Sequence, residues 1–223
     1  DVNENSAIIQ DIEKRHIGCV ILFDRDVPSR ADSRNIESPA QLKKLTSRLQ
    51  SAGKTPLLIA IDQEGGVVCR LRPDRGFPET VTAQSLGMQN DLSLTRRQGR
   101  LIAYTLSQAG INLNLAPVVD LDLNPENPVI GKLGRSFSAD PCVVASHATE
   151  FIKAHSRQGV LCCLKHFPGH GSSAQDSHKG LTDVTDTWSE KELVPYQRLI
   201  ALGLADVIMT AHVYNARLDD RYP

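Results

Sequence analysis

The chain has 223 residues, of which 40% are hydrophobic, enough to bury the core of one large domain. Its 25 lysines and arginines nearly balance 26 aspartates and glutamates, so no overall charge attracts nucleic acid or an anionic membrane. Five cysteines without a framework spacing favour a fold that does not depend on disulfides. The sequence contains no signal peptide or membrane-length apolar run, which predicts a cytoplasmic protein. Export is the alternative, because an N-terminal signal could be missing from this chain.

Apolar runs alternate with amphipathic windows along the chain. We expect strands over residues 17–23, 56–62, 111–120, 160–167 and 205–212, and helices over 38–53, 94–110, 140–159 and 189–203. Asp140 is the predicted N-cap of the third helix, and Ser189 with Glu192 forms a possible capping box for the fourth. The strand runs are continuously apolar, which indicates a parallel sheet covered on both faces.

Five β–α steps without a repeat or linker predict a single α/β domain over residues 1–223. Polar residues stand where successive strands end: Asp62, Asp120, Lys165, His166 and His212. Functional groups at the carboxyl ends of parallel strands are typical of a (β/α)8 TIM barrel. Because about five units are visible, we expect an incomplete barrel that lacks material at both ends.

The stretch KHFPGHGSSAQDSH, residues 165–178, concentrates reactive side chains. His166 and His170 have helical ligand spacing, but the Pro168-Gly169 pair between them is incompatible with a helix. A loop-built metal site from His166, Asp176 and His178 therefore remains only as an alternative interpretation.

A catalytic interpretation uses the same stretch differently. Lys165 and His166 would present hydrogen-bond donors at a strand end, which suits a hydroxyl-rich or anionic ligand. After a glycine-containing loop, Asp176 can orient the ring of His178 and stabilise its charged form, giving an acid–base group with a pKa near neutrality. Such a loop could close over a substrate. The alternative is a solvated polar loop.

Two other segments contribute candidate ligand-binding residues. In IDQEGGVVCR, residues 61–70, Asp62 could accept hydrogen bonds from two sugar hydroxyls, with Arg70 nearby in sequence. The alternative role for Asp62 is to cap a tight turn. The long loop over residues 124–141 carries Arg135, and loops of this length are often functional, although a packed structural loop is the other interpretation.

At this point the motifs match a known family. KHFPGHG, four further residues and then Asp176-Ser177-His178 resemble the signature of family-3 glycoside hydrolases of the β-N-acetylglucosaminidase branch. The resemblance covers nearly the whole chain, because further motifs fit in order: GCVILFDRDV, IAIDQEGGVVCRL, GINLNLAPVVDLDLNPENPVIG, GRSFSADP and IMTAH. The Asp-x-His motif argues against the β-glucosidase branch, which shares only the Lys-His pair.

The resemblance implies a β-N-acetylhexosaminidase that removes terminal N-acetyl-β-D-glucosamine (GlcNAc) with retention of configuration, from saccharides of the peptidoglycan or chitin type. It implies His178 as general acid/base and Asp176 as its partner. The residues implied to hold the sugar are Asp62, Arg70, Arg135, Lys165 and His166. We expect no metal and no organic cofactor, a saccharide as the only partner, no nucleic acid or membrane partner, and a monomer if the barrel is complete.

The nucleophile of the family is an aspartate at the end of a later barrel strand, and the resemblance places it beyond Pro223. Two alternatives follow for the activity. A glycoside phosphorylase of the same family would use phosphate in place of water, and a non-catalytic form would bind the sugar without hydrolysing it.

Overall fold

The computed structural model describes residues 3–26, 28–176 and 180–222. At its centre lies a parallel five-stranded sheet in the order β1-β2-β5-β6-β8. The strands are β1 (Cys19–Leu22), β2 (Leu58–Ile61), β5 (Leu113–Asn114), β6 (Leu161–Phe167) and β8 (Val207–Thr210). Their spatial order follows the chain order, so each strand lies beside the next one, as in a barrel. The expected incomplete TIM-barrel-type α/β fold is confirmed.

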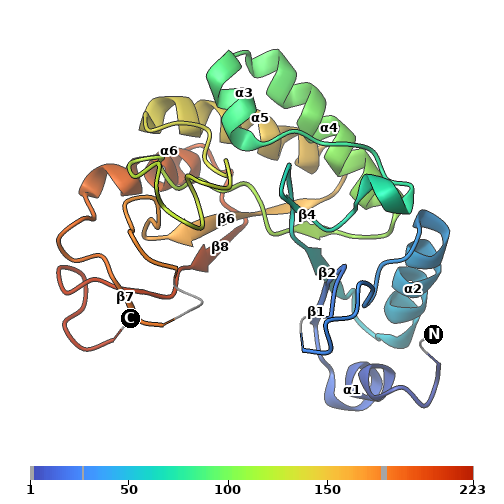
Figure 1. Cartoon of the computed structure of the whole chain (residues 1–223). Coiled ribbons are helices and arrows are strands. Elements are labelled where there is room, and N and C mark those ends of the chain that lie inside the picture. Colours follow the sequence, from blue (N-terminus) through green and yellow to red (C-terminus); the bar gives the residue numbers. More distant parts are fainter. Residues whose placement is uncertain (1–2, 27, 177–179, 223) are drawn as a thin grey trace.

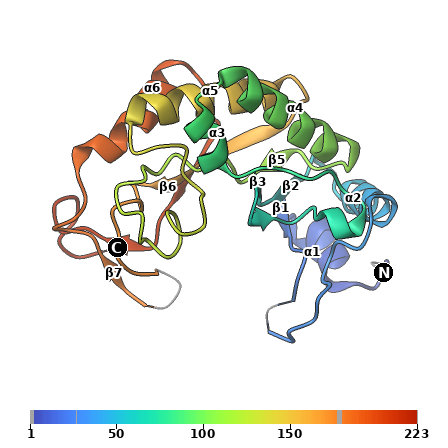
Figure 2. The ribbon, with the colours of Figure 1, turned by 45° about the horizontal axis from the view of Figure 1, so that its top comes forward.

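The helices lie along the convex outer side of this curled sheet (Figures 1 and 2). They are α1 (Ala7–Arg15), α2 (Pro39–Ala52), α3 (Ala83–Gln89), α4 (Leu92–Gln108), α5 (Pro141–Ser156) and α6 (Val194–Ala201). The predicted cap of α5 is confirmed, because the Asp140 side chain accepts a hydrogen bond from the Cys142 N–H and Pro141 begins the helix. Among the described residues, no helix is long and apolar enough to cross a membrane.

Successive side chains of the strands alternate between two hydrophobic clusters. One set joins the large core that also contains helix residues: Ile59, Ile61, Cys162 and Leu164. The other set forms a smaller cluster on the opposite face of the sheet: Ala60, Leu113, Leu115 and Cys163. Side chains two residues apart in a strand share a face. Lys165 therefore lies on the same face as Cys163, two residues closer to the carboxyl end of β6.

Several short elements escape prediction from the sequence. The chain also forms α1, α3, a 3-10 turn η1 (Pro73–Arg75), a hairpin of β3 (Gln63–Gly65) with β4 (Val68–Cys69), and a parallel pair of β7 (Thr182–Asp183) with β9 (Val213–Tyr214). Strands of two or three residues are too short to show a hydrophobic period. The strand expected over 111–120 is shorter than predicted. Only Leu113 and Asn114 form β5, and a single bridge between Val118 and Lys165 follows it.

Two expectations are wrong. Ser189 makes no capping bond, and the expected helix begins as a 3-10 helix, η2 (Glu190–Leu193), before α6. The carboxylate of Glu192 interacts with the backbone of Ser189, as a capping box requires, but it also contacts the loop after β6. In addition, the edge strands are not covered on both faces, since the side chains of Ile21 and Ile208 remain 42% and 39% exposed.

A buried amide ties the sheet to α5 just below the strand ends. Asn114 Oδ1 accepts from the Gln63 N–H (3.1 Å), and Asn114 Nδ2 donates to Gln63 O (3.0 Å) and to His155 Nε2 (3.0 Å). His155 Nδ1 donates in turn to Phe151 O (2.9 Å). These partners require a neutral imidazole, and burial accordingly lowers the pKa of His155 to about 4.

We predict that this histidine makes the fold sensitive to acid. The unfolded chain binds a proton at His155 below pH 6.5 and the folded chain only below about 4, so stability falls as the pH falls through this window. The loss amounts to about 3 kcal/mol at 1.36 kcal/mol per pKa unit. Urea unfolding between pH 7 and pH 4 measures it.

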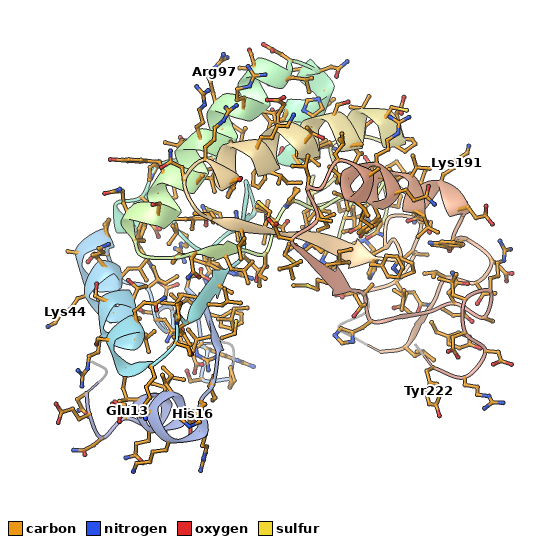
Figure 3. The ribbon with its side chains drawn as sticks, turned by 180° about the vertical axis from the view of Figure 1, so that it is seen from behind. Glu13, His16, Lys44, Arg97, Lys191 and Tyr222 are labelled. Carbon is orange, nitrogen blue, oxygen red and sulfur yellow. The ribbon has the colours of Figure 1, made fainter. Side chains whose placement is uncertain are left out.

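The matched comparison is between His155→Gln, which removes the buried ionisable group, and His16→Asn. His16 is exposed at the end of α1 (Figure 3). His155→Gln should flatten the pH dependence and His16→Asn should leave it unchanged. Equal slopes in both variants would contradict the prediction.

Candidate active site

A buried lysine and a partly buried arginine share one carboxylate at the carboxyl end of the sheet. Lys165 is 2% exposed, and its Nζ lies 2.7 Å from Asp62 Oδ1 and 2.6 Å from Glu64 Oε1. Arg135, from the loop before α5, approaches the same Glu64 with Nε at 2.8 Å from Oε2 and Nη2 at 2.7 Å from Oε1. Burial by itself would raise the pKa of Glu64, but the charges of Lys165 and Arg135 lower it to about 2.

Asp120 organises the turn that follows β6. This buried carboxylate accepts hydrogen bonds from His166 Nδ1 (2.7 Å) and from the backbone N–H groups of His166 (3.2 Å) and His170 (2.9 Å). These contacts, with the charge of His166, outweigh the effect of burial and lower the pKa of Asp120. His166 Nε2 lies 3.3 Å from Arg135 Nη2, which joins this pair to the lysine–arginine cluster.

Arg70, immediately after β4, completes the network on its other side. Its Nη2 lies 3.6 Å from Asp62 Oδ2 and its Nη1 lies 3.5 Å from Oδ1 of Asp24, whose side chain is 7% exposed. The two oxygens of Asp62 therefore face two different cations, Lys165 and Arg70. The structure brings together all five residues predicted to hold a sugar, although they come from four separate segments.

The charges of this network are nearly balanced. Four carboxylates, those of Asp24, Asp62, Glu64 and Asp120, meet three cations, those of Arg70, Arg135 and Lys165, with His166 beside them. At the rim, Asp24 also lies 3.8 Å from Arg25 and from Arg72, whose charges are met by Asp32 and Asp74. Alternating donors and acceptors suit a neutral ligand whose hydroxyl groups both donate and accept hydrogen bonds. A phosphate or sulfate group would need an excess of positive charge, which this cluster does not supply.

The predicted acid–base pair is only partly described. Asp176 is half-buried and lines a pocket of about 310 Å³ with Pro128 and Ala174. His178 lies outside the described residues, so its position relative to Asp176 stays a prediction. The loop that leads to Asp176 is held at its start, where Asn127 Nδ2 donates to His170 O (2.7 Å) and Asn124 Nδ2 donates to Ser173 O (3.0 Å).

Sequence reasoning assigned no site role to Glu64, Asp120 or Glu192. Glu64 stands two residues beyond Asp62, a spacing that places both carboxylates on one side of an extended chain and was a usable signal. Asp120 stands at a predicted strand end, but no cationic residue lies near it in sequence, so the sequence does not indicate its partner His166. Within residues 3–26, 28–176 and 180–222, no group of three or more histidines, cysteines, aspartates and glutamates is arranged to hold a metal ion. The alternative metal site includes His178 and lies partly outside those ranges.

The model of the glycosyl hydrolase family 3 N-terminal domain matches residues 1–223. The chain belongs to glycosyl hydrolase family 3. Beta-hexosaminidase A of Pseudoalteromonas piscicida is 39% identical over 221 residues, which cover 94% of this chain and 35% of that relative. Beta-hexosaminidase of Nitrosomonas eutropha is 37% identical over 216 residues, covering 91% of this chain and 57% of the relative. The chain thus spans between about a third and about three fifths of the length of these curated relatives.

Solved structures agree with this membership in family 3. A family-3 beta-N-acetylglucosaminidase from Paenibacillus sp. FPU-7 matches with a TM-score of 0.87 and 36% identity, covering 98% of this chain and 40% of the other. NagZ from Neisseria gonorrhoeae, in complex with N-trifluoroacetyl-D-glucosamine, matches with a TM-score of 0.82 and 33% identity, covering 95% of this chain and 61% of the other. The resemblance noted in the sequence is confirmed.

We predict that the shared carboxylate is essential for stability as well as for the site. Glu64→Gln removes the charge between Lys165 and Arg135, and removing one partner of a buried ion pair lowers the free energy of unfolding by about 3 kcal/mol. The control is Glu126→Gln, at an exposed pair 3.0 Å from Lys132, which should change it by about 0.5 kcal/mol or less. Urea unfolding at pH 7 measures the free energy of unfolding of both variants and of the wild type. Equal effects would contradict the account of the cluster.

Proposed function

We propose that the protein is a retaining β-N-acetylhexosaminidase that removes terminal GlcNAc residues from the non-reducing ends of saccharides. The observation that supports this most is the charge-balanced network at the carboxyl end of the sheet, in which the five candidate sugar-binding residues pair with Asp24, Glu64 and Asp120. Its mixture of donors and acceptors suits a neutral sugar, and the relatives named above are beta-hexosaminidases.

In the proposed reaction His178 is the general acid and then the general base, with Asp176 as its partner. An aspartate, which the family resemblance places in a strand after residue 223, attacks the anomeric carbon while His178 protonates the departing glycosidic oxygen. The bond between these two atoms breaks and a covalent glycosyl–enzyme forms. Water then gives a proton to His178 and attacks the anomeric carbon, the bond from that carbon to the aspartate breaks, and GlcNAc leaves with its original configuration and the aspartate as a free carboxylate.

For the substrate, we propose saccharides of the peptidoglycan or chitin type that end in GlcNAc. The NagZ structure from Neisseria gonorrhoeae contains N-trifluoroacetyl-D-glucosamine, an N-acylated glucosamine. With 33% identity and 95% of this chain aligned, that relative supports an N-acylated amino sugar as the group recognised here.

A glycoside phosphorylase is the second candidate. The observation in its favour is the histidine at position 178, because a neutral acid–base group repels an incoming phosphate less than a carboxylate does. The balanced charges of the sugar-binding network favour hydrolysis, since they offer a phosphate no excess of cations. Turnover that rises with phosphate and yields GlcNAc 1-phosphate would decide for the phosphorylase.

We predict that His178→Ala in the full-length protein discriminates between leaving groups. Cleavage of chitobiose, whose sugar alcohol needs a proton to depart, should fall by about 100-fold or more. Cleavage of an activated dinitrophenyl N-acetyl-β-D-glucosaminide should fall much less, because its leaving group departs as an anion. The exposed His16→Ala should change neither rate. Equal losses on both substrates would refute the acid role of His178.

A further inference from the structure

One buried carboxyl group lies outside the sugar-binding network and contacts the catalytic loop. Glu192 is the third residue of η2 and is 1% exposed. Its neighbours Glu190 and Lys191 are exposed, and Lys191 extends from the outer surface in Figure 3. Of these three consecutive charged residues, therefore, only Glu192 turns into the protein.

The carboxyl group of Glu192 accepts two hydrogen bonds from the start of the loop. The Gly171 N–H lies 3.1 Å from Oε2, and the Ser172 hydroxyl lies 2.7 Å from Oε1. Two residues before Glu190, Trp188 donates from its indole Nε1 to Pro168 O at 3.0 Å. The segment 188–192 thus holds the loop at Pro168, Gly171 and Ser172.

The packing at this contact leaves no room for a side chain at Gly169 or Gly171. A Cβ atom added to Gly169 would lie 2.5 Å from Glu192 Oε2, and one added to Gly171 would lie 1.7 Å from Leu121 O. On its other side the loop is fixed by the bond from the His170 N–H to Asp120. Residues 169–172 are therefore clamped between Asp120 and Glu192.

Glu192 acts here as a hydrogen-bond acceptor and not as half of an ion pair. Among the residues that the structure describes, no lysine or arginine forms a salt bridge with it, and the ionisable groups close enough to interact with it are Asp120 and the Tyr196 hydroxyl on α6. Burial, with the charge of Asp120 adding, raises the pKa of Glu192 to about 7 against its hydrogen bonds with Ser172, Gly171 and the backbone of Ser189. A neutral side chain of the same shape should therefore fulfil its role.

We propose that Glu192 is a positioning residue that sets the path of the loop from Gly169 to Asp176. The inference rests on the proposed function for its effect on turnover, because that loop carries the predicted acid–base pair. Without the acceptor, the Gly171 N–H and the Ser172 hydroxyl lose their partner, and the loop leaves its place. Within the described parts of the chain, no hydrogen bond joins Glu192 to the sugar-binding network, so substrate affinity is retained.

The test compares three variants of the full-length protein with 4-nitrophenyl N-acetyl-β-D-glucosaminide as substrate. Glu192→Ala should lower kcat by about tenfold to 100-fold, the cost of misplacing a catalytic group by roughly 1 Å, with KM changed by about twofold or less. Glu192→Gln should retain most of kcat, because its amide oxygen accepts from Gly171 and its amide group donates to the Ser172 hydroxyl. Glu190→Ala, the exposed neighbour, should behave as the wild type.

Hydrogen–deuterium exchange separates this inference from the proposed function, since it does not require activity. Amides of residues 169–176 should exchange faster in Glu192→Ala, and should be unchanged in Glu192→Gln and Glu190→Ala. If the wild type proves inactive on the sugar, this local pattern still supports the role of Glu192. Unchanged exchange of residues 169–176 in Glu192→Ala would overturn the proposed role of Glu192. So would exchange in β2 and α4 that becomes faster by the same factor as in the loop. A loss of kcat in Glu192→Gln as large as in Glu192→Ala would also overturn it.

Discussion

The site depends on the burial of a positive charge at the inner face of the sheet. An unpaired lysine in this position would be too costly, so Lys165 requires carboxylates, and Asp62 and Glu64 supply them at 2.7 and 2.6 Å. Glu64 in turn fixes Arg135 and with it the long loop before α5. A single lysine at the end of β6 therefore determines how three separate segments of the chain meet.

The strand ends also explain what the sequence could predict. Lys165, His166 and Asp62 stand directly after apolar runs, and parallel strands bring their carboxyl ends to one edge, so their proximity follows from the pattern. The pairing of Glu64 with Arg135 does not, because 71 residues separate them. The role of Glu192 follows only in part from the sequence for a related reason: its spacing from Ser189 indicates a contact with the start of the helix, and it does not show that the same carboxyl group also reaches Gly171 and Ser172.

The described site combines a network of ion pairs with a loop that is held by hydrogen bonds. Carboxylates and cations of the sugar-binding network hold one another in place before any ligand arrives, as pre-organised binding requires. The loop toward Asp176 is held at its beginning by Asp120 and Glu192, and by Asn127 and Asn124 at the backbone oxygens of His170 and Ser173. In the proposed mechanism this division is useful, because the sugar must be held firmly while the acid–base group approaches and withdraws between the two steps.

The most direct measurement is the anomeric configuration of the first product, followed by proton NMR as the full-length protein cleaves 4-nitrophenyl N-acetyl-β-D-glucosaminide in phosphate buffer. The account predicts free GlcNAc that appears first as the β-anomer and then mutarotates. Initial α-anomer, GlcNAc 1-phosphate as the product, or binding of the sugar without cleavage would contradict it.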